Sequence, residues 1–254
     1  MDRLLNDPVF AAFAIAATLL AGLSKGGFGG GLGFVGVLGL AQVSSPVTAV
    51  AIMLPILCVM DLIGAWAYRR DWHRPSMKVL GTGCVIGTAI GMLTFRWMDE
   101  QIIQLIVGSI AILFFVDFFR SGGEQAVARV FSKPVGYVLG TIAGFTSFVI
   151  HAGLPPVAMY LLPQRLDKRT HVGTIVILFF FVNYLKLLPY WWLGLFSAPN
   201  ISTALILMPL APVGMILGIR FNYLIPQKVF LRISYSILFL LGLRMTYEGL
   251  SPYF

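Results

Sequence analysis

Ten apolar stretches, separated by short polar or proline-containing segments, make up most of this chain of 254 residues. They are predicted as helical segments at about 8–23, 28–42, 47–68, 77–95, 101–119, 135–149, 153–163, 170–190, 200–220 and 227–247. A helix needs ~20 apolar residues to cross the hydrocarbon core of a bilayer. Most stretches approach that length, whereas 28–42 and 153–163 are too short for a comfortable crossing. We expect these two to be half-helices, each meeting its neighbour in a hairpin.

Two glycine-rich stretches interrupt this pattern. The first, residues 21–32, reads AGLSKGGFGGGL, and the second, residues 143–154, reads AGFTSFVIHAGL. Such dense glycine predicts a break in the helix, and irregular backbone within a membrane occurs only where protein buries it or where it lines a cavity. Paired breaks in two halves of a chain are typical of a transporter's binding site. Close helix packing, for which Gly27 and Gly31 have the right spacing, is the alternative.

The two halves of the chain resemble each other at an offset of 122 residues. Ser24 corresponds to Thr146, Asp61 to Asn183, and Tyr68 to Tyr190. We therefore predict an all-α, polytopic membrane protein built from two repeats of about five segments each. The predicted division is a first repeat at 1–120, a cytoplasmic linker at 121–133 and a second repeat at 134–254.

Basic residues decide the orientation that we expect. If every stretch passes from one side of the membrane to the other, 14 of the 18 Lys and Arg residues fall on one face and three on the other. The positive-inside rule assigns the basic face to the cytoplasm. Five side-changing segments per half make the repeats inverted, with both termini outside. If the two short stretches are instead re-entrant, the basic residues divide almost evenly.

The composition excludes an ordinary soluble domain, because 58% of the residues are hydrophobic and 11% are charged. The net charge of +8 fits cytoplasmic loops, so we expect no nucleic-acid partner. The two cysteines lie in apolar stretches, without the spacing of a metal site. The sequence GLGFVG at 31–36 lies between membrane segments instead of the strand and helix of a dinucleotide site. We expect neither enzyme activity nor a cofactor.

Ionisable side chains inside the apolar stretches mark a candidate binding site, because they cost ~2.5–3.5 kcal/mol at the centre of a membrane helix. Lys25 abuts the first glycines, and Lys186 lies one turn after Asn183 on the same helix face. Together with backbone N–H groups they suit an anion, whereas snorkelling to the membrane surface is the alternative for either lysine. The predicted substrate-binding residues are Ser24, Lys25, Gly29, Gly30, Gly31, His151, Gly153, Pro155, Asn183 and Lys186.

Two side chains are candidates for coupling transport to protons. Asp61 is the one acid deep within a predicted span, and it either pairs with Lys186 or takes up a proton. His151 opens the second hairpin, and histidine titrates near physiological pH. A hydrogen-bonded structural function is the alternative for His151.

At these residues the chain resembles the TauE/SafE family of membrane proteins, the sulfite exporters. The resemblance covers nearly the whole chain and rests on SKGGFGGG at 24–31, on HAGLPP at 151–156 and on LLPQR at 161–165. Many members have a GGG-type motif in both halves, whereas this chain has His-Ala-Gly at 151–153. The resemblance implies export of sulfite or a small organosulfonate, driven by the proton gradient, across a bacterial inner membrane.

Other functions stay open from the sequence. A passive anion channel would share the positive cavity without alternating access, and a transporter of small carboxylates would differ in its substrate. A membrane subunit without transport of its own is a further alternative. The expected partners are a small anionic substrate, namely sulfite or a sulfonate, and the lipid bilayer. A homodimer is left open.

Overall fold

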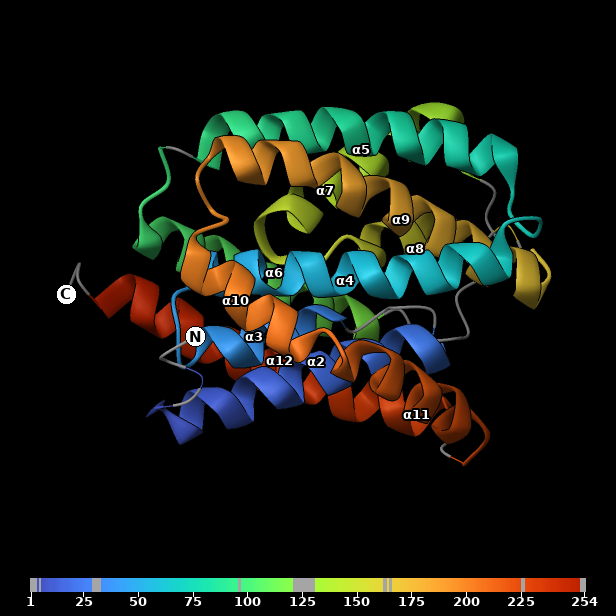
Figure 1. Cartoon of the computed structure of the whole chain (residues 1–254). Coiled ribbons are helices and arrows are strands. Elements are labelled where there is room, and N and C mark those ends of the chain that lie inside the picture. The colour runs from blue at the N-terminus through green and yellow to red at the C-terminus, as the bar shows by residue number, and fades with distance from the viewer. Residues whose placement is uncertain are drawn as a thin grey trace.

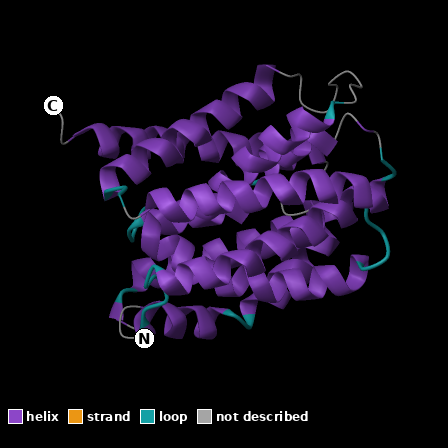
Figure 2. Ribbon diagram, turned by 90° about the horizontal axis from the view of Figure 1, so that it is seen from above, coloured by secondary structure: helices purple, strands orange, loops and turns teal. Residues whose placement is uncertain are grey.

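Every regular element in the described part of the chain is a helix (Figure 1, Figure 2). The computed structural model describes residues 4, 6–28, 33–95, 97–120, 131–161, 164, 166–224 and 227–251. The helices are α2 (Pro8–Phe28), α3 (Gly33–Ala41), α4 (Pro46–Tyr68), α5 (Arg74–Phe95), α6 (Glu100–Arg120), α7 (Lys133–Ile150), α8 (Leu154–Leu161), α9 (Lys168–Trp192), α10 (Ala198–Leu207), α11 (Leu210–Leu224) and α12 (Gln227–Leu250). The predicted all-α fold is confirmed.

Five of the described helices are long and apolar enough to cross a membrane, or six if the bent pair α10–α11 forms one span. The segment predicted at 200–220 is this pair, whose helices meet at an angle of 47°. Pro209 lies at the break, where its missing N–H and its ring disfavour a continuous helix. The two segments predicted to be short are α3, with 9 residues, and α8, with 8 residues.

Helix α2 continues through Gly22 and Gly26 to its end at Phe28, and α3 begins at Gly33, so the break predicted within 21–32 lies after Phe28 and not after residue 23. These glycines lie where α2 contacts α11. A Cβ atom at Gly22 would lie 2.8 Å from the Cα atom of Gly214, and one at Gly26 would overlap the backbone of Met215. Close backbone packing offsets the low helix propensity of glycine, so the packing alternative explains both positions.

The second glycine-rich stretch is also helical up to a short break at 151–153. His151 ends α7 in a left-handed conformation, with φ 58° and ψ 23°. Its N–H donates to the carbonyl oxygen of Ser147 at 3.0 Å, and the N–H of Ala152 donates to that of Thr146 at 3.2 Å. The Thr146 hydroxyl donates in return to the Ala152 carbonyl at 3.0 Å. These bonds fix the turn that leads into α8.

The most extensive helix contacts join α5 to α7, α2 to α11, and α6 to α12. Figure 1 shows α5 and α7 on one side of α4, and α2 and α11 on the other. Helix α4 also packs against α9. If α2 corresponds to α7 and α5 to α10–α11, the contact between α2 and α11 corresponds to the contact between α7 and α5. The predicted repeats require this correspondence. The inversion of the repeats across the membrane stays a prediction.

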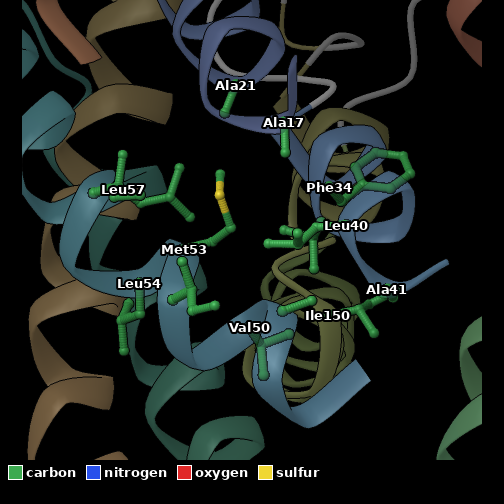
Figure 3. Close-up of a cluster of buried hydrophobic side chains, with 14 of the residues drawn as sticks. Ala17, Ala21, Phe34, Leu40, Ala41, Val50, Met53, Leu54, Leu57 and Ile150 are labelled. Atoms are coloured by element: carbon green, nitrogen blue, oxygen red, sulfur yellow. The ribbon is translucent and has the colours of Figure 1, made fainter. Parts of the chain in front are cut away.

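An apolar core surrounds α4 and holds the neighbouring helices in place (Figure 3). Met53 of α4 points towards Ala21 of α2, and Ile150, the last residue of α7, lies near Leu40 of α3. All four side chains are fully buried. This core fixes α2, α4 and the turn after α7 relative to one another, and the polar groups described next come from these elements and from α9.

Candidate functional site

Three charged side chains gather inside the helices that are long enough to span a membrane. Asp61 of α4 and Lys186 of α9 are 2% and 0% exposed, and the side chain of Lys25 of α2 is 13% exposed. Removing a charge from water costs several kcal/mol unless a partner compensates for it. The partners of these three groups therefore define the candidate site.

Asp61 connects α2 to α9 through its two carboxylate oxygens. Oδ1 forms an ion pair with the Nζ atom of Lys25. Oδ2 accepts a hydrogen bond of 2.5 Å from Nδ2 of Asn183. Lys25 also donates to the carbonyl oxygen of Leu57 at 3.3 Å. Because its ammonium is held by α4 in this way, Lys25 does not snorkel to the membrane surface.

Lys186 contacts the turn between α7 and α8. Its Nζ atom donates to the carbonyl oxygen of Ser147 at 2.9 Å and to the Ser147 hydroxyl at 3.1 Å. It also lies 2.7 Å from Nδ1 of His151, whose Nε2 is 3.1 Å from the carbonyl oxygen of Val50. A carbonyl only accepts, so Nε2 carries the proton and Nδ1 accepts from Lys186. Three donated bonds use all three protons of an ammonium.

The sequence alternative that pairs Asp61 with Lys186 is not what the structure contains. The cationic partner of Asp61 is Lys25, and the three partners of Lys186 are uncharged. Asn183 and Lys186 share a face of α9, as predicted, but the longer lysine side chain reaches the α7–α8 turn instead of α4. Burial of the Lys186 side chain also excludes snorkelling.

The two halves of the chain contribute corresponding positions to this cluster. At the offset of 122 residues, Lys25 corresponds to Ser147, and Asp61 corresponds to Asn183. The first half thus provides an ion pair, where the second half has a hydroxyl and an amide. The ammonium of Lys186 lies beside that hydroxyl. Two ammonium groups and one carboxylate give the cluster one net positive charge.

Gly153 and Pro155, both predicted to bind substrate, have evident structural functions in the turn. A Cβ atom at Gly153 would lie 2.8 Å from the carbonyl oxygen of Ala143 and 3.0 Å from Cβ of Ser147, so the turn passes too close to α7 for a side chain. Pro155 is buried in the first turn of α8, where its fixed φ suits the start of a helix. A contact of either residue with substrate stays a prediction.

Ser24 and the three glycines that follow Lys25 complete the predicted set. Ser24 is fully buried on α2, next to Lys25 in the sequence. Gly29, Gly30 and Gly31 lie outside the described residues, so their predicted contacts with an anion stay a prediction.

The sequence analysis did not identify Ser147 and Tyr190 as parts of the site. Tyr190 follows Lys186 by one helical turn, and its buried hydroxyl donates to the carbonyl oxygen of Phe148 at 2.5 Å. Its ring packs edge-on against Phe148, with ring centroids 5.1 Å apart. These contacts fasten α9 to the end of α7. The repeat offset was the signal that could have found Ser147, because it corresponds to Lys25.

The described residues contain no group of three or more His, Cys, Asp or Glu side chains placed to hold a metal ion. The cluster itself provides two ammonium groups, a carboxylate and neutral hydrogen-bonding groups. This combination attracts an anion and offers a carboxylate for a proton.

Comparison with known proteins gave one match. A family model described as Sulfite exporter TauE/SafE matches residues 11–245, a range that includes every charged residue of the cluster. No curated protein and no solved structure matches the chain.

Proposed function

The chain belongs to the TauE/SafE family of multi-pass membrane transporters, and on this premise we propose that it is a secondary transporter that exports a small sulfur oxyanion. The substrate class is sulfite or an organosulfonate. The binding site lies where α9 meets α2, α4 and the turn after α7. Coupling to the proton gradient belongs to the same proposal.

The observation that carries this proposal is the buried ammonium of Lys186, whose three partners are all uncharged. A buried cation without a counter-ion is costly in a membrane helix. A sulfite or sulfonate group would supply the missing negative charge. One of its oxygens would replace a neutral acceptor of the ammonium, and another would accept from the Ser147 hydroxyl. Lys25 lies in the same cluster and adds to the attraction for an anion.

Asp61 is the group that we assign to proton coupling. Its protonation removes the one negative charge of the cluster and releases Lys25 from its ion pair. His151 is less suited, because its Nδ1 accepts from Lys186 at 2.7 Å. A proton on that nitrogen would place two cations in direct contact, which costs free energy. We therefore give His151 the function of positioning Lys186.

Alternating access is supported by the arrangement of the helices. In the two halves of the chain, α2 matches α7 and α11 belongs to the pair that matches α5. The contact between α2 and α11 in one half therefore corresponds to the contact between α7 and α5 in the other. Helices α4 and α9 carry Asp61, Asn183 and Lys186 between these two pairs. A relative movement of the pairs would expose the cluster to one side of the membrane at a time.

The test is uptake into proteoliposomes that contain the purified protein, measured for sulfite, methanesulfonate, sulfate and acetate with and without a proton gradient. We expect gradient-dependent movement of a sulfur oxyanion, and its acceleration by counterflow. The control variant is Lys78→Ala, which removes an exposed lysine of α5. Currents too large for a carrier's turnover would indicate a channel, and movement of acetate alone would overturn the substrate class.

A further inference from the structure

The charge of the buried cluster comes from Lys25, Asp61 and Lys186, because the described groups around these three residues are uncharged. Two ammonium groups and one carboxylate contribute a net charge of +1. Among the described residues, the other polar or titratable groups around them are uncharged: the Leu57 carbonyl and Cys58 of α4, Cys84 of α5, Ser147 and His151 at the end of α7, and Asn183 and Tyr184 of α9. The connection at 29–32 lies outside the described residues, but its sequence, GGGL, contains no ionisable side chain.

We infer that the site is matched to one negative charge, so that its occupied state is electroneutral. A monoanion such as a sulfonate binds while Asp61 is ionised, and a dianion binds with a proton on Asp61. This inference rests on the proposed transport function and specifies it further. Its physical reason is that an uncompensated charge interacts strongly in surroundings of low dielectric constant, where neither water nor salt screens it.

The same rule explains how a proton would accompany one substrate and not another. Sulfite as a dianion needs the proton on Asp61, whereas hydrogen sulfite carries that proton itself and needs none there. The total number of protons and charges moved is equal in the two cases. A sulfonate has no dianionic form, so its binding requires an ionised Asp61.

The internal repeat provides a test that changes charge while it hardly changes shape. Asp61 and Asn183 occupy corresponding positions and touch each other at 2.5 Å. Asp61→Asn raises the charge of the cluster to +2. Asn183→Asp adds a carboxylate in contact with Asp61, and because two carboxylates in contact share one proton, the charge stays at +1. The double variant moves the carboxylate from α4 to α9 and restores the charge of +1 with the same two side-chain types.

The experiment compares uptake of methanesulfonate, a monoanion, with uptake of sulfate, a dianion, by each variant in proteoliposomes at pH 6. We expect the wild type to prefer methanesulfonate by roughly tenfold or more, since neutralising a buried charge is worth at least that factor. Asp61→Asn should prefer sulfate, whereas Asn183→Asp and the double variant should both keep the preference for methanesulfonate. Size-exclusion profiles in detergent check that each variant folds.

The inference is overturned if Asp61→Asn keeps the preference for methanesulfonate, or if the double variant prefers sulfate as Asp61→Asn does. Equal uptake of both anions by the wild type overturns the charge match alone, whereas no uptake of any sulfur oxyanion overturns the proposed function. If a variant does not fold, the wild type still provides a test, because it should take up methanesulfonate in preference to sulfate.

Discussion

Replacing Lys186 by methionine removes one ammonium from the cluster while it keeps an unbranched side chain of similar length. The variant leaves three acceptors without their donor: the carbonyl oxygen and hydroxyl of Ser147 and Nδ1 of His151. Hydrogen bonds to a charged group contribute ~1.5–3 kcal/mol each. The cost of burying the ammonium disappears at the same time, and buried charges replaced by apolar groups are often neutral for stability.

We therefore expect Lys186→Met to fold, with a free energy of unfolding within ~2 kcal/mol of the wild type. Substrate binding should suffer far more. An ammonium and an oxyanion ~4 Å apart attract each other by ~4 kcal/mol at an effective dielectric constant of 20, which corresponds to roughly a thousandfold in affinity. Even a third of that attraction would weaken binding by about tenfold.

The assay is the concentration dependence of sulfite and methanesulfonate uptake into proteoliposomes, together with thermal unfolding in detergent. Lys186→Arg keeps the charge and should retain measurable uptake, although its planar group cannot reproduce the geometry around Ser147. Lys78→Met, on the exposed face of α5, should behave as the wild type. If Lys186→Met transports within about threefold of the wild type, the ammonium does not bind the substrate and the reasoning is refuted.

Other predictions concern backbone and packing. His151→Ala should lower the unfolding temperature more than His151→Gly, because only glycine adopts the left-handed backbone at 151 without a cost of ~1 kcal/mol; equal effects would contradict this. Gly83→Ala should destabilise by ~1–3 kcal/mol, because its Cβ would lie 2.5 Å from a carbonyl oxygen of α7. Gly39→Ala should stabilise the protein slightly in the same thermal assay, because the added Cβ would contact no neighbouring group within 4 Å. Asp167 caps α9 outside the span, and its hydrogen bonds to the residue three positions later lower its pKa. Stabilisation by the ionised cap is therefore present above its ordinary value of 3.8 and is lost as the pH falls through the lowered pKa; Asp167→Asn should remove this acid dependence of unfolding.

The helices could be predicted because a membrane span requires a long apolar run, and charge or proline marks where each run ends. The bend between α10 and α11 was missed, although Pro209 was a visible signal for it. The continuity of α2 could not be predicted from its own residues. It depends on α11, whose Gly214 allows the close approach that makes Gly22 favourable in a helix.

It was easier to predict which residues belong to the site than to predict which of their side chains contact each other. Lys186, Asn183 and Asp61 were identified because polar groups are costly in apolar helices, and all three are buried. Their partners depend on how far each side chain reaches across the interface between helices. The spacing along α9 does not contain that information, so the ion pair with Lys25 emerges only from the packing of α2 against α4. Substrate contacts and proton coupling stay predictions.

The left-handed turn at position 151 has a consequence for how such a protein can evolve. At the repeat offset His151 corresponds to Gly29, so one half has an imidazole where the other has no side chain. A backbone conformation that glycine adopts freely, and histidine at modest cost, can be kept while the side chain changes. Single substitutions here could then alter the neighbourhood of Lys186 without altering the path of the chain. Such a position lets substrate preference drift among descendants of one ancestor while the scaffold stays constant.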